Sequence, residues 1–473
     1  MGKIDKKKLE QFLEEHREEM VQDICDMIRI PSVVTEPVGE FPYGEQAAAA
    51  VDQFRKIAQR LGFETKNVDY RAVYASSGGK KRGLDLLTHL DVVPAGDEWT
   101  VTDGYTPLVK DGKIYGRGAM DDKGPLIMAL YALYAVRCLE ISLDKEVRIV
   151  AGSNEENGGR EDLRYYLEKE GEAEITLCPD GDYPVINVEK GKLRGKTTAK
   201  FSDTGALPKI VSVSGGSKRY IIPGETQAVI QGFEAGELQN YIREAEKETG
   251  IRFTVTEEKD KKCTLLATGE ESHMGAPEAG NNALTGMLHL LCMLPFAPCE
   301  GFERLKGLNR VFPHGDYLGK ASGIQRKTED SGELFAVFNI FHYSPEEFTG
   351  SFDCKLPRGC TEENTKNILI AALEKQGITV KDSEFAEALY MPMDGKLMQT
   401  ILKFYTEYTG KESYGITING NTYVDILKNQ RATFGCMMPG TDYHIHFGDE
   451  YALVEELLTS AKIYAELIAE FCS

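Results

Sequence analysis

The candidate metal ligands of this chain fall in two parts of the sequence that lie far apart. Four of them, His89, Asp121, Glu156 and Asp180, lie in the first half of the 473 residues, and the fifth, His446, lies near the end. More than half of the chain separates Asp180 from His446. A site that uses all five therefore requires the chain to leave a first domain, form an insertion, and return to that domain.

Each candidate lies in a short polar segment. The segments are Thr88–Pro94, Gly116–Gly124, Ser153–Gly159, Pro179–Asp182 and His446–Glu450. Each segment alone is weak evidence, because a His-x-Asp pair on a strand is more often incidental than functional and an acidic pair in a loop is usually a solvated turn. The Asp121-Asp122 pair could equally be a helix N-cap. All five in this order, several of them at the ends of predicted strands, indicate one shared site.

The residue types indicate a centre with two metal ions. Two divalent ions that lie close together need a bridging carboxylate and further ligands on each side, and we expect Asp121 to be the bridge. His89 and Asp180 then complete one ion's site. Glu156 and His446 complete the other. These nitrogen and oxygen ligands suit Zn²⁺, Mn²⁺ or Co²⁺, and the sequence does not choose among them. Such a centre points to hydrolysis, in which water activated between the ions attacks an amide carbonyl.

Two further carboxylates are catalytic candidates. His89 and Asp91 are two residues apart on a predicted strand and point the same way, so we expect Asp91 to accept the second ring N–H of His89 and fix its tautomer. Glu155 is adjacent to Glu156 but points in a different direction. A carboxylate beside the reacting water is suited to take its proton and pass it to the leaving amine, so Glu155 is the expected general base.

The hydrophobic pattern predicts an α/β fold. Apolar residues at helical spacing predict helices over residues 5–28, 46–61, 125–139, 395–408 and 453–471, and short apolar runs predict buried strands at 84–88 and 147–151. Alternating buried strands and helices indicate a central, largely parallel mixed sheet flanked by helices, with the ligands at the carboxyl ends of its strands. We expect this domain to comprise residues 1–192 and 387–473.

The stretch between these two parts has a different character. From residue 193 to residue 386 the predicted strands are longer, more polar and alternating, which is typical of half-exposed sheets. Helices predicted at 281–294 and 361–376 each follow a strand-rich stretch. We therefore expect an inserted α+β domain with two lobes.

Composition excludes several classes of partner. The formal net charge of −20 argues against nucleic acid or an anionic membrane, because both would repel the chain. No apolar run approaches the length of a transmembrane helix, and no apolar signal-peptide segment follows the basic N-terminal residues. The ten cysteines include no CxxC pair. We therefore expect a cytoplasmic protein with reduced cysteines.

The five segments resemble those of the co-catalytic metallopeptidases that include aminoacylase, glutamate carboxypeptidase and succinyl-diaminopimelate desuccinylase (the ArgE/DapE/CPG-type enzymes). The resemblance spans the whole chain. Within this family the sequence is most similar to the PepV-type dipeptidases, through His89–Gly96, the run Gly116–Pro125 and the sequence Glu189-Lys190-Gly191. The length of the insertion fits the same subgroup.

The resemblance implies a function and a set of roles. It implies a monomeric dipeptidase that cuts dipeptides with a free amino terminus and binds two divalent ions, Zn²⁺ or Mn²⁺, through the five ligands listed above. It implies that the insertion is a two-lobed lid. It also implies that His273, in the segment Glu271–Glu278, polarises the scissile carbonyl.

Three segments expected to face the lid or the substrate depart from the family pattern. Tyr220 stands where the family has an asparagine that helps to hold the oxyanion. Lys355 replaces an arginine, and it keeps the charge but cannot form a bidentate fork with a carboxylate. Asn421 lies in a segment where the family has Gly-Gly-Thr-Tyr-Ala-Arg, and Asp425 reverses the charge of that arginine. The alternatives are altered peptide specificity, a deacylase of N-acyl amino acids, or a metal-binding homologue with little or no activity.

Overall fold

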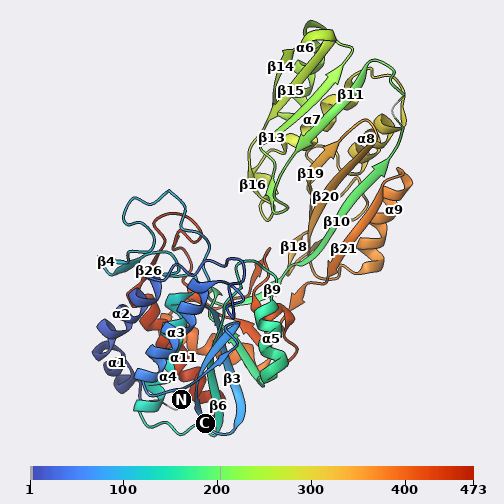
Figure 1. Cartoon of the computed structure of the whole chain (residues 1–473). Helices are drawn as coiled ribbons and strands as arrows, with labels where there is room; N and C mark the ends of the chain where they lie inside the picture. The colour runs from blue at the N-terminus through green and yellow to red at the C-terminus, as the bar shows by residue number, and fades with distance from the viewer. Residues whose placement is uncertain (1–3, 203) are drawn as a thin grey trace. The chain divides into compact units, whose positions relative to one another are not determined.

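The structure is a computed structural model that describes residues 4–202 and 204–473, and the chain divides into two compact units. Unit 1 comprises Met1–Asn187 and Met391–Ser473, and unit 2 comprises Val188–Tyr390. The chain therefore leaves unit 1 after its first strands and helices and returns to it for its last part (Figure 1). Within the described residues, no helix is long and apolar enough to cross a membrane.

A mixed sheet forms the centre of unit 1, with the strand order β1-β2-β6-β3-β7-β24-β9. Its strands are β1 (Glu64–Val68), β2 (Ala72–Gly78), β3 (Lys81–His89), β6 (Lys145–Gly152), β7 (Ile175–Cys178), β9 (Ile186–Glu189) and β24 (Gln430–Thr433). The four central strands β6, β3, β7 and β24 run parallel, whereas β1 and β2 pair antiparallel on one side of them and β9 pairs antiparallel on the other. The predicted α/β class with a mixed sheet is confirmed, and its parallel part is confined to the centre.

Helices cover the sheet of unit 1 on both faces. They are α1 (Lys6–Glu15), α2 (Arg17–Ile28), α3 (Glu45–Arg60), α4 (Lys123–Cys138), α5 (Glu161–Glu170), α10 (Lys396–Thr409) and α11 (Val454–Cys472). Helices α4 and α11 pack against each other and against β3 and β6, while α5 lies on the other side of these strands (Figure 1). Because α4 is enclosed by α2, α11 and the sheet, it is apolar on nearly all sides.

The first predicted helix is two helices. Residues 5–28 were expected to form one helix, but α1 ends at Glu15 and α2 begins at Arg17. His16 lies between them with φ −103°, and its Nδ1 contacts the backbone oxygen of Phe12 at 2.8 Å. The apolar spacing continues on both sides of the break, so the pattern alone could not reveal it.

The main sheet of unit 2 is antiparallel, with the order β14-β15-β13-β11-β19-β20-β10-β21. Its strands are β10 (Gly191–Lys200), β11 (Lys209–Gly215), β13 (Glu225–Gln231), β14 (Arg252–Glu257), β15 (Lys262–Thr268), β19 (Phe335–Tyr343), β20 (Glu347–Leu356) and β21 (Thr379–Ala386). Side chains of β10 alternate between buried and more exposed, as expected for a strand with one face on the core. Unit 2 therefore has the α+β structure that was predicted for the insertion.

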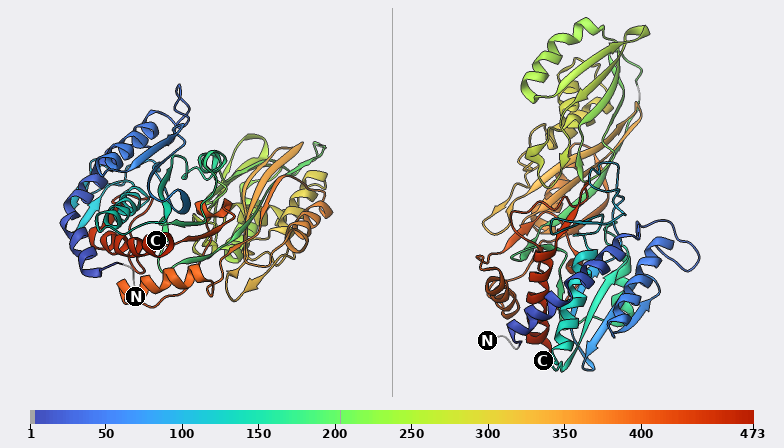
Figure 2. Two further views of the ribbon diagram at one scale, coloured as in Figure 1. Left: turned by 90° about the horizontal axis from the view of Figure 1, so that it is seen from below. Right: turned by 90° about the vertical axis from the view of Figure 1, so that its left-hand side faces the viewer.

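Four helices and a shared apolar core complete unit 2. The helices are α6 (Ala235–Thr249), α7 (Ala283–Met293), α8 (Glu300–Val311) and α9 (Asn367–Lys375), and Figure 2 shows them along one face of the sheet. The two halves expected from the sequence are joined into one sheet, because β11 pairs with β19. They are also not consecutive in sequence, since β10 comes first but pairs with β20 and β21.

Candidate metal centre

The parallel strands of unit 1 bring three of the predicted ligand segments to one edge. Strand β3 ends at His89, β6 ends just before the loop with Glu155 and Glu156, and β7 ends just before Asp180. Because β3 pairs in parallel with both β6 and β7, the carboxyl ends of these three strands lie side by side. Asp121 lies two residues before α4 begins.

A small sheet returns the last ligand segment to the same place. It consists of β4 (Leu108–Lys110), β5 (Lys113–Tyr115) and β26 (Tyr451–Leu453). Tyr451 in β26 pairs with Tyr115 in β5, so the segment that ends in Glu450 lies beside the segment that leads to Asp121. His446 itself has a left-handed backbone, with φ 67°.

The structure brings the five predicted ligands together. His89 Nε2 lies 3.0 Å from Asp121 Oδ1 and 3.7 Å from Asp180 Oδ2. His446 Nε2 lies 2.9 Å from Asp121 Oδ2 and 3.2 Å from Glu156 Oε2. Asp121 thus presents one carboxylate oxygen to each histidine, which is the arrangement that a carboxylate between two ions requires.

The donor atoms fit divalent metal ions. Ligand atoms of His89, Asp121 and Glu156 all lie within 4.8 Å of one another. Two donors bound tetrahedrally to one ion at the usual bond lengths lie about 3.3 Å apart, close to the separations above. Glu156 Oε1 is buried and has no hydrogen-bond partner, so it is free to bind a cation.

The ionisation of these groups also favours cations. Burial and the negative charge of Asp121 raise the pKa of Asp180 to about 7, and burial raises the pKa of Glu155 to about 7. Hydrogen bonds to Asp121 and Glu156 raise the pKa of His446 to about 10. Without metal, protons held on Asp180 and His446 therefore balance part of the negative charge of this cluster. Two cations in place of these protons would let every carboxylate ionise.

Asp91 has a different main contact from the expected one. Its two carboxylate oxygens accept the backbone N–H groups of Glu155 and Glu156, at 3.0 Å each. His89 Nδ1 lies 2.9 Å from the backbone oxygen of Asp91, whereas the nearer carboxylate oxygen is 3.5 Å away. Asp91 therefore orients His89 mainly through its backbone, and its side chain fixes the loop that carries the candidate base.

A second buried carboxylate holds the start of the same loop. Asp162 Oδ2 accepts the backbone N–H groups of Ser153 at 2.9 Å and of Asn154 at 2.8 Å, and the hydroxyl of Tyr423 donates to the same oxygen. Asp162 could not be selected from its motif, because an aspartate in the first turn of a helix is common. Its role depends on Tyr423, which comes from a segment far along the chain.

Arg160 is a second residue at this loop that could not be selected from the sequence. Its Nη1 donates to Glu155 Oε1 at 2.7 Å, and its Nη2 donates to the backbone oxygen of Asn421 at 2.8 Å. Its Nε lies 3.6 Å from Asp425 Oδ1. The reversed charge of Asp425 thus has a local partner in this chain, and Asn421, expected to bind substrate, offers its backbone to Arg160.

A buried ion pair fixes the backbone of the predicted bridging ligand. Glu450 Oε1 accepts the backbone N–H groups of Met120 at 3.0 Å and Asp121 at 3.2 Å. Glu450 Oε2 accepts a hydrogen bond of 2.5 Å from Arg117 Nη1, and both side chains are almost completely buried. This pair joins the two distant parts of the sequence that supply the ligands.

Breaking this ion pair is expected to destabilise unit 1. The Glu450→Gln variant leaves Arg117 buried without a counter-charge, which costs at least about 3 kcal/mol. The loss corresponds to a fall in melting temperature of roughly 6–12 °C for a domain of this size. Calorimetry of the variant measures this fall. The matched control is Glu455→Gln, which removes an exposed pair with Arg17 and should change the melting temperature by less than about 2 °C.

The predicted site residues of unit 2 form a separate group. Strand β12 (Ile221–Ile222) pairs with β16 (Ser272–His273), which places the ring of Tyr220 6.4 Å from the ring of His273. His273 Nδ1 accepts the backbone N–H of Gly275 at 3.1 Å. Burial and the charge of Lys355 lower the pKa of His273. A neutral ring with this contact carries its proton on Nε2, where it can donate to a carbonyl oxygen.

Lys355 belongs to the same unit and is nearly buried. It lies in β20, with only 6% of its surface exposed. Burial lowers the pKa of Lys355, although the negative charge of Asp353 acts in the opposite direction. Tyr220, by contrast, is 51% exposed. Unit 2 therefore combines a shielded cation with an exposed hydroxyl and a neutral imidazole.

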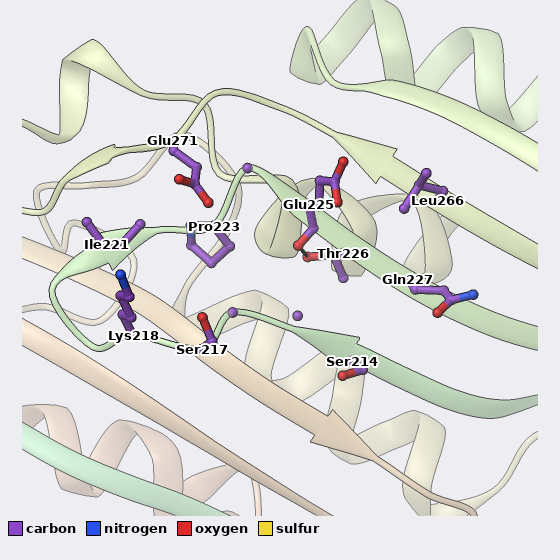
Figure 3. A pocket seen from close by; sticks show the side chains of 13 residues that line it. Ser214, Ser217, Lys218, Ile221, Pro223, Glu225, Thr226, Gln227, Leu266 and Glu271 are labelled. Atoms are coloured by element: carbon purple, nitrogen blue, oxygen red, sulfur yellow. Dashed lines mark hydrogen bonds between the residues drawn. The ribbon is translucent and has the colours of Figure 1, made fainter. Parts of the chain in front are cut away.

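A cavity of about 600 Å³ also lies in unit 2 (Figure 3). Its lining includes Ser217, Lys218 and Ile221, which are neighbours of Tyr220 in sequence, and the carboxylates of Glu225 and Glu271. In Figure 3 Glu271 and Pro223 stand on one side of this space and Ser217 on the other. None of the residues predicted from the sequence to bind metal or substrate lines it.

The chain is similar to known proteins over most of its length. The sequence matches the model of peptidase family M20/M25/M40 over residues 86–470. It is 30% identical over 470 residues to the β-Ala-Xaa dipeptidase of Lactobacillus delbrueckii subsp. lactis, with 97% of each chain covered.

Two solved structures are similar in fold. Human carnosine dipeptidase 1 has a TM-score of 0.60 at 17% identity, with 100% of this chain and 99% of that chain covered. The dipeptidase Dug1p of Saccharomyces cerevisiae has a TM-score of 0.57 at 12% identity, with 98% and 99% covered. At these identities the likeness concerns the fold alone.

Proposed function

Because this chain belongs to peptidase family M20/M25/M40, we propose that it is a metal-dependent dipeptidase that hydrolyses dipeptides with a free amino terminus. The observation that carries the proposal is the Asp121 carboxylate, with one oxygen toward His89 and the other toward His446. Two divalent ions held by the five ligands would supply an activated water and polarise the scissile carbonyl. Zn²⁺ and Mn²⁺ are the proposed ions, and Co²⁺ also suits the ligands.

Glu155 supplies the proton transfer in this proposal. It lies next to the ligand Glu156, and Asp91 fixes the backbone of both residues. An ionised Glu155 accepts a proton from the attacking water and delivers it to the amine that leaves. Its carboxylate accepts a hydrogen bond from Arg160 Nη1 at 2.7 Å.

Unit 2 acts as the substrate-binding lid in this proposal. His273 donates from Nε2 to the scissile carbonyl, and the hydroxyl of Tyr220 offers a second donor for the developing oxyanion. Lys355 attracts the carboxylate of the dipeptide as a point charge, in place of a bidentate guanidinium. The enzyme works as a monomer, and light scattering in solution should give the mass of one chain.

The test is hydrolysis of a panel of unblocked and N-acylated dipeptides. The protein is stripped of metal by a chelator and then given Mn²⁺ or Zn²⁺. We expect no hydrolysis by the stripped protein, and cleavage of unblocked dipeptides alone once metal is restored. Cleavage of the N-acylated compounds would instead identify a deacylase. Two bound ions without cleavage of any compound would identify a metal-binding homologue and overturn the proposal.

A further inference from the structure

Arg160 stands at a constrained position beside the candidate base. It follows Gly158 and Gly159 and directly precedes α5, and its backbone is left-handed, with φ 61°. Residues other than glycine rarely adopt this conformation, and they persist in it where surrounding contacts enforce it. Only 6% of the Arg160 side chain and backbone surface is exposed, so the guanidinium is enclosed by the protein.

The guanidinium joins two loops that are distant in sequence. On the loop after β6, Nη1 donates to the carboxylate of Glu155 at 2.7 Å and lies 3.3 Å from the backbone oxygen of the same residue. On the segment before η4 (Tyr423–Ile426), Nη2 donates to the backbone oxygen of Asn421 at 2.8 Å. The guanidinium also lies over the ring of Tyr423, at 5.3 Å from its centroid.

Asp425 gives the guanidinium its second counter-charge. Arg160 Nε and Asp425 Oδ1 face each other at 3.6 Å, and both atoms are buried without a hydrogen-bond partner. Arg160 therefore lies between two carboxylates, Glu155 on one edge and Asp425 on the other. Asp425 and the backbone oxygen of Asn421 hold the guanidinium of Arg160 against the segment that contains η4, independently of Glu155.

We propose that Arg160 is a positioning residue that fixes the orientation of the Glu155 carboxylate by tying it to the segment Asn421–Asp425. This inference rests on the proposed function, because it deepens the role of the same base. The planar guanidinium is essential to this role, because each of its three nitrogens faces a different group: the Glu155 carboxylate, the backbone oxygen of Asn421 and the Asp425 carboxylate. A lysine ammonium carries the same charge but cannot hold these groups in one plane.

Steady-state kinetics of Arg160→Gln and Arg160→Lys test the role in catalysis. Misplacement of a catalytic group by about 1 Å costs about 10²-fold in rate, so we expect kcat of Arg160→Gln to fall about 100-fold. KM and the number of bound metal ions should stay within about twofold, because Arg160 contacts none of the five ligands and touches Asn421 at its backbone oxygen rather than at the side chain expected to face the substrate. Arg160→Lys should lose at least about tenfold in kcat, because a point charge does not replace the fork.

The control is Arg164→Gln, on the helix α5 that follows Arg160. Arg164 is exposed, so the same substitution there should leave kcat, KM and metal content unchanged. An Arg160→Lys enzyme with the kcat of the unmodified protein would overturn the inference, because charge alone would then suffice. So would a loss of kcat in Arg160→Gln that only matches a loss of bound metal.

Hydrogen exchange gives a readout that does not depend on hydrolysis. Amide exchange in residues 153–160 and 421–426 should be faster in Arg160→Gln than in the unmodified protein, and unchanged in Arg164→Gln. If the unmodified protein cleaves no dipeptide, the proposed function fails, while this measurement still decides whether Arg160 ties the two segments. Unchanged exchange in both segments overturns the inference whatever the activity.

Discussion

The Glu155→Gln variant is expected to lose about 10³-fold in kcat for dipeptide hydrolysis while it still binds two metal ions. General acid–base catalysis contributes about 10²–10⁴-fold, and glutamine has nearly the same shape as glutamate but cannot accept the proton of the attacking water. The amide can still accept a hydrogen bond from Arg160 Nη1, which lies 2.7 Å from Glu155 Oε1. The loss therefore reports on the proton transfer rather than on the fold of the loop.

Metal content and kinetics together make this test decisive. Elemental analysis of the dialysed variant should give two ions per chain, and KM should remain close to that of the unmodified protein. The matched control is Glu168→Gln on α5, because Glu168 is exposed and should tolerate the change. A Glu155→Gln protein with undiminished kcat would assign the base to another residue. A protein that has lost its metal would assign Glu155 to the ligands.

The local motifs of the sequence predicted the convergence of the ligands because each motif lies at the end of an element. His89 closes β3, and Glu156 and Asp180 follow β6 and β7. Parallel strands bring such ends to one edge, whatever the residues between them. The position of His446 beside the other ligands could be expected only because a centre with two metal ions needs a further ligand. The structure achieves it through the pairing of β26 with β5, which nothing in the sequence signals.

The residues that hold the site in place could not be predicted in the same way. Arg160 and Glu450 act through partners more than 250 residues away in sequence, namely Asn421 and Arg117. A buried charge and an exposed charge look alike in a single sequence, because burial is a property of the folded chain. For the same reason the Asp91 carboxylate was predicted to contact the ring of His89. In the structure this carboxylate accepts hydrogen bonds from the backbone N–H groups of Glu155 and Glu156.

The order of strands in unit 2 illustrates a further limit. Alternating polarity identified its strands as half-exposed, and this property is visible in β10 and β13. Alternation does not specify which strand pairs with which. The first strand of the insertion, β10, pairs with β20 and β21, which lie more than 140 residues later, so the two expected halves became one continuous sheet.

Removal of the Asp121 side chain is expected to abolish binding of both metal ions, whereas removal of any other ligand should weaken one. Asp121 offers Oδ1 to His89 and Oδ2 to His446, so it belongs to both halves of the centre. Glu156 contacts only His446 in this set, and Asp180 contacts only His89. We expect Asp121→Ala to retain less than one ion per chain after dialysis and to lose at least about 10³-fold in kcat/KM, because both ions contribute to the reaction.

Titration of the stripped proteins with Mn²⁺ or Zn²⁺ distinguishes these cases. An ion that binds only the folded state raises the melting temperature as its concentration rises, so the unmodified protein should be stabilised at both sites. Glu156→Gln should retain the stabilisation that comes from the ion bound by His89, Asp121 and Asp180. Asp121→Ala should show almost none, while Asp144→Asn, at an exposed position, should behave as the unmodified protein does. An Asp121→Ala protein that still binds two ions would mean that the centre is held by separate ligand sets with no shared carboxylate.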